Sequence, residues 1–154
     1  MHLDEIDLRI LEIVQENSDL PTKEIASRLN LTVSPVYERI KKLEQEGTIK
    51  RYVALVDSAK VERNLVAFCE VSLSQHSQEY LFEFEKAVQC IPIVTETYHI
   101  TGAYDYLLKV VIKNMDEYQD FIINKLSVLN NVATVQSMFI LNTVKHTTAI
   151  PLMA

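Results

Sequence analysis

Residues 21–49 constrain the fold more than any other part of the chain, because they describe two short helices joined by a tight turn. Apolar residues recur there at helical spacing: Ile25, Ala26 and Leu29 in the first half, and Val36, Ile40 and Leu43 in the second. Each half therefore has one narrow apolar stripe, which a helix can bury only against a neighbour. The two helices are expected to pack on each other and on a third helix.

The ends of the second helix of this pair can be read from three residues. Ser34 followed by Pro35 is typical of an N-cap with proline at the first helical position, and Gly47 suits a left-handed C-cap. The outer side of the helix is polar and largely basic. A helix-turn-helix presents its recognition helix to the major groove in this way, so the segment predicts DNA binding.

The charge of the chain is concentrated in a way that agrees with this hypothesis. The net charge is −6, yet residues 21–51 contain seven basic and four acidic residues, which gives 7 − 4 = +3. The remainder contains 8 basic and 17 acidic residues, which gives 8 − 17 = −9. An acidic remainder opposes loose adhesion to phosphates, so binding is expected to depend on this one positive segment, present in more than one copy.

Other classes of protein find little support in the sequence. With 48% hydrophobic residues the chain is globular, no apolar run is long enough to span a membrane, and the acidic N-terminus is unlike a secretory signal, so a cytoplasmic location is expected. Cys69 and Cys90 are expected to be buried free thiols, and the four histidines lack the spacing of metal ligands. No phosphate loop or catalytic constellation appears, so neither an enzyme nor a cofactor is expected.

The fold expected from the whole sequence is α+β. Leu3–Glu16 predicts the third helix of a winged-type helix-turn-helix domain over residues 1–50, and a strand at Ile49–Val56 opens a linker over residues 51–64. Residues 65–154 predict a ferredoxin-like βαββαβ domain. Its expected elements are strands at 66–73, 94–101, 104–112 and 132–141, and helices at 78–90 and 114–129, the latter capped by Asn114.

A sheet of this type carries its helices on one face, which leaves the other face to be covered. That face is expected to carry Phe68, Tyr98, Ile100 and Leu108, or their alternates, depending on the register. We expect a second copy of the chain to cover it. The alternative is that the linker covers it within one chain.

Three separate stretches resemble the Lrp/AsnC (feast/famine) family of transcription regulators, and together the resemblance spans nearly the whole chain. They are Leu3, Asp4, Asp7, Ile10 and Leu11 in the first helix; Leu43, Glu44, Gly47 and Ile49 after the second helix of the pair; and Gly102, Tyr104, Asp105 and Tyr106 in the hairpin. The resemblance implies a C-terminal domain of the ferredoxin-like RAM type, a homodimer on double-stranded DNA, and assembly of dimers into tetramers or octamers.

By the same resemblance, a small effector, expected to be an amino acid, binds between dimers around one loop. The residues implied are Thr101, Gly102, Ala103, Tyr104, Asp105, Asn114, Thr134 and Gln136. The glycine permits close approach of the backbone, and Asp105 or Asn114 could receive an ammonium group. Asp105 could equally serve only to cap the hairpin. Ala103 and Asn114 are neutral where family members often carry an acidic residue, so the effector is expected to differ, to bind weakly or to be absent.

Nine residues are the candidates for contact with DNA. Ser34, Tyr37, Glu38 and Lys41 are expected to reach base edges, since the early turns of a recognition helix enter the groove. Phosphate contacts are expected from Lys23, Arg39, Lys42, Lys50 and Arg51. Alternatives remain open here: Tyr37 could be a core residue, Glu38, which stands where many relatives have arginine, could lie on a solvated surface, and so could any one of the basic side chains.

Two functions remain in competition. The first is a sequence-specific regulator that responds to an effector through a change of assembly. The second is an architectural DNA-wrapping protein without an effector. An enzyme is disfavoured because no catalytic constellation is present.

Overall fold

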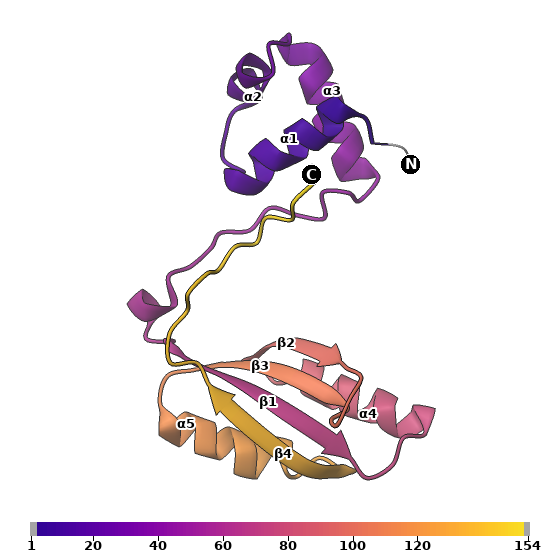
Figure 1. Cartoon of the computed structure of the whole chain (residues 1–154), viewed down its shortest axis with the longest axis vertical. Coiled ribbons are helices and arrows are strands. Elements are labelled where there is room, and N and C mark those ends of the chain that lie inside the picture. The colour runs from indigo at the N-terminus through magenta and orange to yellow at the C-terminus, as the bar shows by residue number, and fades with distance from the viewer. Residues whose placement is uncertain (1–2, 153–154) are drawn as a thin grey trace. The chain divides into compact units, whose positions relative to one another are not determined.

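The computed structural model describes residues 3–152, and these form two compact units (Figure 1). The first unit contains the residues up to Leu55 together with those from Val144 onward, and the second contains Val56–Thr143. The expected division placed everything after residue 64 in one domain. The structure instead groups the C-terminal segment with the first unit, so the chain leaves that unit and returns to it.

Three helices build the first unit, as the apolar stripes predict: α1 (Glu5–Glu16), α2 (Thr22–Arg28) and α3 (Val33–Gln45). Their buried residues form one cluster: Ile10, Leu11, Ile25, Ala26, Val36, Ile40 and Leu43. Ala26 is 1% exposed, which agrees with close packing of α2 on α3.

The expected N-cap of α3 is wrong by two residues, whereas its expected end is confirmed. Thr32 is the N-cap, so Ser34 and Pro35 both lie within the first helical turn. Proline is tolerated there because the first amides of a helix have no intrahelical acceptor. At the other end Gly47 has φ +74°, the left-handed conformation expected after a helix.

The strand expected at Ile49–Val56 is also wrong. Residues 50–57 are extended but belong to neither a helix nor a strand, and a short 3₁₀ helix, η1 (Ser58–Val61), follows. Alternating residues form a strand only where a neighbouring strand receives their backbone hydrogen bonds. Within the described residues of one chain no such neighbour lies beside this segment, and Leu55 remains 70% exposed.

The second unit has the ferredoxin-like order that the sequence predicts. Its elements are β1 (Leu65–Leu73), α4 (Gln78–Gln89), β2 (Val94–His99), β3 (Tyr106–Ile112), α5 (Met115–Asp120), the π-helix η2 (Phe121–Leu126) and β4 (Val132–Phe139). The sheet order is β2-β3-β1-β4, and all three pairs of neighbouring strands are antiparallel.

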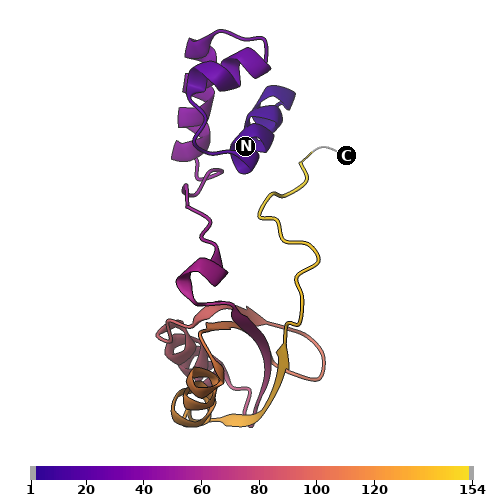
Figure 2. The ribbon, with the colours of Figure 1, turned by 90° about the vertical axis from the view of Figure 1, so that its left-hand side faces the viewer.

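Helix α4 and the continuous helix formed by α5 and η2 lie on one face of the sheet (Figure 2). The face beneath them carries Ala67, Cys69 and Val71 of β1, all 0% exposed. Cys90 is exposed at the C-cap of α4, so its expected burial is wrong. Leu108 pairs with Cys69 and is equally buried, so its expected place beside Phe68 is wrong. Phe68 pairs with Lys109 on one side and Met138 on the other, and these residues mark the uncovered face.

The helix expected over residues 114–129 changes its winding halfway along. Asn114 caps its start, since Asn114 Oδ1 accepts a hydrogen bond of 2.9 Å from the Glu117 amide. From Phe121 the helix continues with π geometry. The wider turn brings residues five apart to the same side, and Phe121 and Leu126 are both 0% exposed. Met115, in the first turn of the helix, is 53% exposed.

Candidate functional site

The exposed side of α3 carries the residues expected to reach base edges. Ser34, Tyr37 and Glu38 are all exposed, and the side chain of Tyr37 is 48% accessible. Tyr37 is therefore a surface residue, and the alternative that it belongs to the core is wrong. Leu31 and Val33, in the turn and at the helix start, add apolar surface beside these three polar groups. Such a surface can contact both base edges and thymine methyl groups.

Lys41 lies on the same side but is engaged within the unit. Its Nζ donates to Glu44 Oε2 at 2.7 Å and lies 5.8 Å from the centre of the Tyr37 ring. The Tyr52 hydroxyl donates to the other Glu44 oxygen at 3.0 Å, which ties the segment after α3 back to the helix. Hydrogen bonding to Lys41 lowers the pKa of Glu44, and burial followed by the contact with Glu44 raises the pKa of Tyr52 to about 12.

Four of the five expected phosphate contacts are exposed cations: Lys23, Lys42, Lys50 and Arg51. Exposed, flexible cations of this kind suit the phosphate backbone, because they need no fixed geometry before binding.

Arg39, the fifth, is placed differently. Its Nη1 donates to Asp4 Oδ2 at 2.7 Å and to Asp7 Oδ1 at 2.6 Å, and the side chain is only 31% exposed. The same two aspartates form the capping box of α1, where the Asp7 amide donates to Asp4 Oδ1 at 2.8 Å. The backbone bond from Asp7 and then the bond from Arg39 lower the pKa of Asp4. Arg39 thus fastens α3 to the first turn of α1.

The loop expected to hold an effector joins β2 to β3 in the second unit. Thr101, Gly102 and Ala103 are exposed, and Gly102 has φ +128°, a conformation that favours glycine. A side chain placed at Gly102 would meet nothing within 4 Å, so the loop is open on that side. Backbone amides in an open loop can approach an anionic group closely.

Tyr104 and Gln136 come together beside this loop, since the Tyr104 hydroxyl donates to Gln136 Oε1 at 2.6 Å. Thr134 is exposed two residues earlier on β4, on the same face of the sheet as Gln136.

Asp105 is held on both of its carboxylate oxygens. Oδ2 accepts a hydrogen bond of 2.7 Å from the Leu73 amide, and Oδ1 lies 2.9 Å from Nε2 of His76. The backbone bond, followed by the contact with His76, lowers the pKa of Asp105. The hairpin role that was left open in the sequence is therefore present in the structure, and it occupies the oxygens that an ammonium group would need.

Asn114 does not lie near the loop within one chain. It follows the far end of β3, and nine residues of extended chain from Asp105 span roughly 30 Å. Its side-chain oxygen is used as the helix cap. Among residues 3–152 no three His, Cys, Asp or Glu side chains gather as a metal site requires.

Comparison with known proteins assigns each half of the chain to a known domain family. Residues 3–50 match the model of a winged helix-turn-helix DNA-binding domain, and residues 66–150 match that of the Lrp/AsnC ligand-binding domain. The chain belongs to the Lrp/AsnC family of transcription regulators. A relative that is 35% identical over 145 residues, spanning 94% of this chain and 93% of its own, is the leucine-responsive regulatory protein of Rhizobium meliloti.

Solved structures of Lrp/AsnC regulators have the same fold over almost the whole chain. A regulator of Neisseria meningitidis, in complex with L-methionine, is 34% identical with a TM-score of 0.94 and covers 98% of this chain and 97% of its own. An AsnC family regulator of Agrobacterium tumefaciens is 35% identical with a TM-score of 0.93 and covers 97% of each chain. This chain is accordingly a transcription regulator and not an enzyme. Its described part contains no helix with the length and apolarity of a membrane span.

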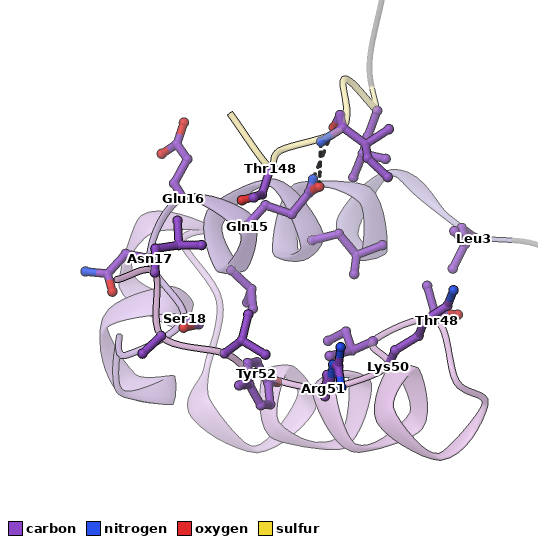
Figure 3. A pocket seen from close by; sticks show the side chains of 18 residues that line it. Leu3, Gln15, Glu16, Asn17, Ser18, Thr48, Lys50, Arg51, Tyr52 and Thr148 are labelled. Carbon is purple, nitrogen blue, oxygen red and sulfur yellow. Dashed lines mark hydrogen bonds between the residues drawn. The ribbon is translucent and has the colours of Figure 1, made fainter. Parts of the chain in front are cut away.

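Reasoning from sequence missed one group of residues in the first unit. Gln15 of α1 and Ile150 of the C-terminal segment are joined by two hydrogen bonds, although they are 135 positions apart (Figure 3). The only local signal is Pro151, which restricts the residue before it to an extended conformation.

Proposed function

We propose that this chain recognises specific DNA sequences through α3 and responds to a small effector, an amino acid, bound by its C-terminal domain. The observation that carries the first part is the exposed surface of Ser34, Tyr37 and Glu38, in a segment of the chain that also contains four exposed cations. Ser34, Tyr37 and Glu38 read base edges in this proposal, and Lys41 joins them by exchanging Glu44 for a base acceptor. Lys23, Lys42, Lys50 and Arg51 contact phosphates.

Arg39 has a positioning role in this proposal rather than a phosphate contact. Its guanidinium is held by two carboxylates at 2.7 Å and 2.6 Å, and charge-assisted bonds of this length are among the stronger interactions of a protein surface. It therefore fixes the orientation of α3 on α1, and hence the direction in which the base-reading residues point.

The effector is proposed to bind at Thr101–Asp105 with Thr134 and Gln136 of β4, and to meet Asn114 of another subunit across the interface between dimers. What supports an amino acid is the complex of a 34% identical neighbour with L-methionine. The open backbone at Gly102 suits the carboxylate of such a ligand. Gln136 Oε1 already accepts from the Tyr104 hydroxyl, and its second lone pair can accept from the ammonium group of the ligand.

Thermal unfolding against the twenty amino acids tests this assignment. One or a few of them should raise the melting temperature by several degrees, since a ligand at 100 times its Kd stabilises the folded state by about 2.7 kcal/mol. Gln136→Ala should abolish the response, while Gln89→Ala, at an exposed position of α4, should leave it intact. Equal responses of the two variants would place the ligand elsewhere.

A DNA-wrapping protein without an effector is the second candidate. The observation that favours it is the engagement of Asp105 by Leu73 and His76, together with the neutral residue Ala103, which leaves little free negative charge around the loop. Indifference of the melting temperature to every amino acid would support this candidate and contradict the first.

Assembly into dimers, and of dimers into tetramers or octamers, is proposed from the uncovered apolar surface. The outer face of the sheet carries Phe68 and Met138, the latter 44% exposed. A second copy that covers this surface would remove apolar area from water, which favours association.

Sedimentation equilibrium at micromolar concentration should therefore give a dimer or a larger species. Phe68→Asp should shift the distribution toward monomer, because it places a charge in the proposed interface. The matched control is Phe82→Asp on α4, at a side chain that is 65% exposed, and it should assemble like the parent. A monomeric parent protein would remove the proposal.

A further inference from the structure

The C-terminal segment of the first unit is bound to helix α1 by two hydrogen bonds. The pair resembles the two backbone hydrogen bonds that opposite residues exchange in an antiparallel sheet. Gln15 Nε2 donates to the carbonyl oxygen of Ile150 at 3.1 Å, and the Ile150 amide donates to Gln15 Oε1 at 2.7 Å. Figure 3 shows both bonds between the side chain on α1 and the backbone of the segment. One side chain thus satisfies both polar backbone groups of one residue, a pattern that requires the residue to be extended.

The residues around Ile150 favour the extended backbone that this contact requires. Pro151 disfavours helical backbone at the residue before it, and an extended residue points its N–H and C=O to the same side. Pro151 itself has no N–H, so Ile150 supplies the only backbone donor of this pair of residues. Immediately before Ile150, the Ala149 amide donates to Thr147 Oγ1 at 3.1 Å, which gives the approach to Ile150 local order.

Apolar contacts continue the attachment beyond the hydrogen bonds. Leu152 packs against the three-helix core that contains Ile10 and Leu11. The segment also forms one wall of a cavity of about 770 Å³, whose other walls are the end of α1 and the residues that follow α3. Apolar members of those walls include Val14, Ile49 and Val53. The surface is thus a groove lined by apolar side chains, with the side-chain amide of Gln15 positioned to bind a peptide backbone.

We propose that this groove, formed by the second half of α1 and residues 48–55, is a peptide-binding site whose ligand is the chain's own segment Thr148–Leu152. Gln15 is the residue that selects an extended backbone, and Leu152 is the apolar anchor. Both residues determine which peptide binds. The Gln15 amide accepts any residue with an extended backbone, and the site of Leu152 requires an apolar side chain two positions later. The lining of the groove includes none of the base-reading residues of α3, and the loop at Gly102 belongs to the second unit.

A tryptophan reporter tests this proposal in the full-length chain, which has no tryptophan of its own. Leu152→Trp, combined with Cys90→Ser to remove the exposed thiol, should give blue-shifted emission that iodide quenches poorly. Adding Gln15→Leu removes both hydrogen bonds at nearly constant side-chain volume. The ratio of docked to undocked segment should then fall about 30-fold, with a red shift and strong quenching. Gln89→Leu is the matched control and should have no effect.

Hydrogen exchange in the unaltered protein gives a second measurement that does not depend on the fit of tryptophan. The Ile150 amide should be protected, and Gln15→Leu should remove that protection while the amides of α2 and α3 keep theirs. If the Ile150 amide exchanges at the rate of an unstructured chain, or if Gln15→Leu and Gln89→Leu give the same spectra, the proposal is overturned.

Mixing subunits decides whether the segment docks on its own chain. The Leu152→Trp chain that carries Gln15→Leu is incubated with an excess of parent chains, long enough for subunits to exchange. Docking in the same chain predicts that the red-shifted emission persists. Recovery of blue-shifted emission would show that the groove of another subunit holds the segment, which contradicts the proposal.

Discussion

The double variant Lys42→Ala and Arg51→Ala is expected to bind every duplex more weakly, on the order of 100-fold at moderate salt, because phosphate contacts supply the sequence-independent part of DNA affinity. Both side chains are exposed in the segment that carries the chain's positive charge. A bound dimer would lose four phosphate contacts, so the slope of log affinity against log salt should flatten by about 3.6. Fluorescence anisotropy over a salt series measures both quantities.

The controls for this variant separate phosphate contacts from base contacts. Lys86→Ala, at an exposed position of α4, should bind DNA like the parent. Ser34→Ala and Glu38→Ala should change the ranking of sequences and leave the salt slope as it was. If the double variant lost affinity for one duplex only, these two cations would be reading bases and the assignment would be wrong.

Arg39→Ala is expected to lower the melting temperature of the DNA-binding unit by about 5 °C or more, because it leaves Asp4 and the largely buried Asp7 without their partner. Arg28→Ala removes a comparable ion pair, to Glu24 at 2.8 Å, but both of those side chains are 47% exposed. That variant should melt within a degree or so of the parent, since exposed pairs contribute little. Differential scanning calorimetry compares the two.

The effect of Arg39 should depend on pH in a defined direction. The pKa of Asp4 is lowered from its ordinary value of 3.8, so the stabilisation is present above that value and is lost as the pH falls through the lower pKa of the folded state. The difference in melting temperature between parent and Arg39→Ala should be full at pH 7 and shrink below about pH 4. A constant difference across this range would show that the carboxylates are not its source.

DNA binding by Arg39→Ala distinguishes positioning from phosphate contact. Measured well below the melting temperature, the variant should bind all duplexes more weakly but keep the salt slope of the parent, because the guanidinium is committed to Asp4 and Asp7. If the slope of log affinity against log salt were smaller by about 2 for the dimer, Arg39 would contact phosphates, as the sequence predicted.

The sequence predicted elements wherever a residue pattern and its partner lie close together in the chain. The three helices, the order of the ferredoxin-like sheet, the cap at Asn114 and the left-handed Gly47 all follow from local spacing. The π-helix did not follow, since a stripe with a period of 3.6 residues cannot reveal that Phe121 and Leu126 share a side. The prediction of a strand at Ile49–Val56 is wrong because alternating residues indicate the two faces of a strand but not whether a second strand lies beside it.

In the candidate sites, too, the sequence predicted what depends on local spacing and not what depends on distant residues. Exposure of Ser34, Glu38 and Lys42 could be expected from helical spacing alone. The partners of Arg39 could not, because Asp4 and Asp7 are 35 and 32 residues away and have a sufficient local explanation as helix caps. Asp105 carried the hairpin role as one open alternative, and only the geometry at Leu73 and His76 shows that both of its oxygens are used.

The return of the chain to its first unit makes the ligand-binding unit an inserted domain. Its first strand and its last are neighbours in the sheet, with Ala67 opposite Phe139 and the Ile140 amide donating to the Val66 carbonyl at 2.9 Å. The strands of the insert therefore begin and end about 5 Å apart, the spacing of adjacent strands. A unit with ends this close can be exchanged for another of similar span without stretching its host, which offers a simple route by which one DNA-reading head could acquire different sensors.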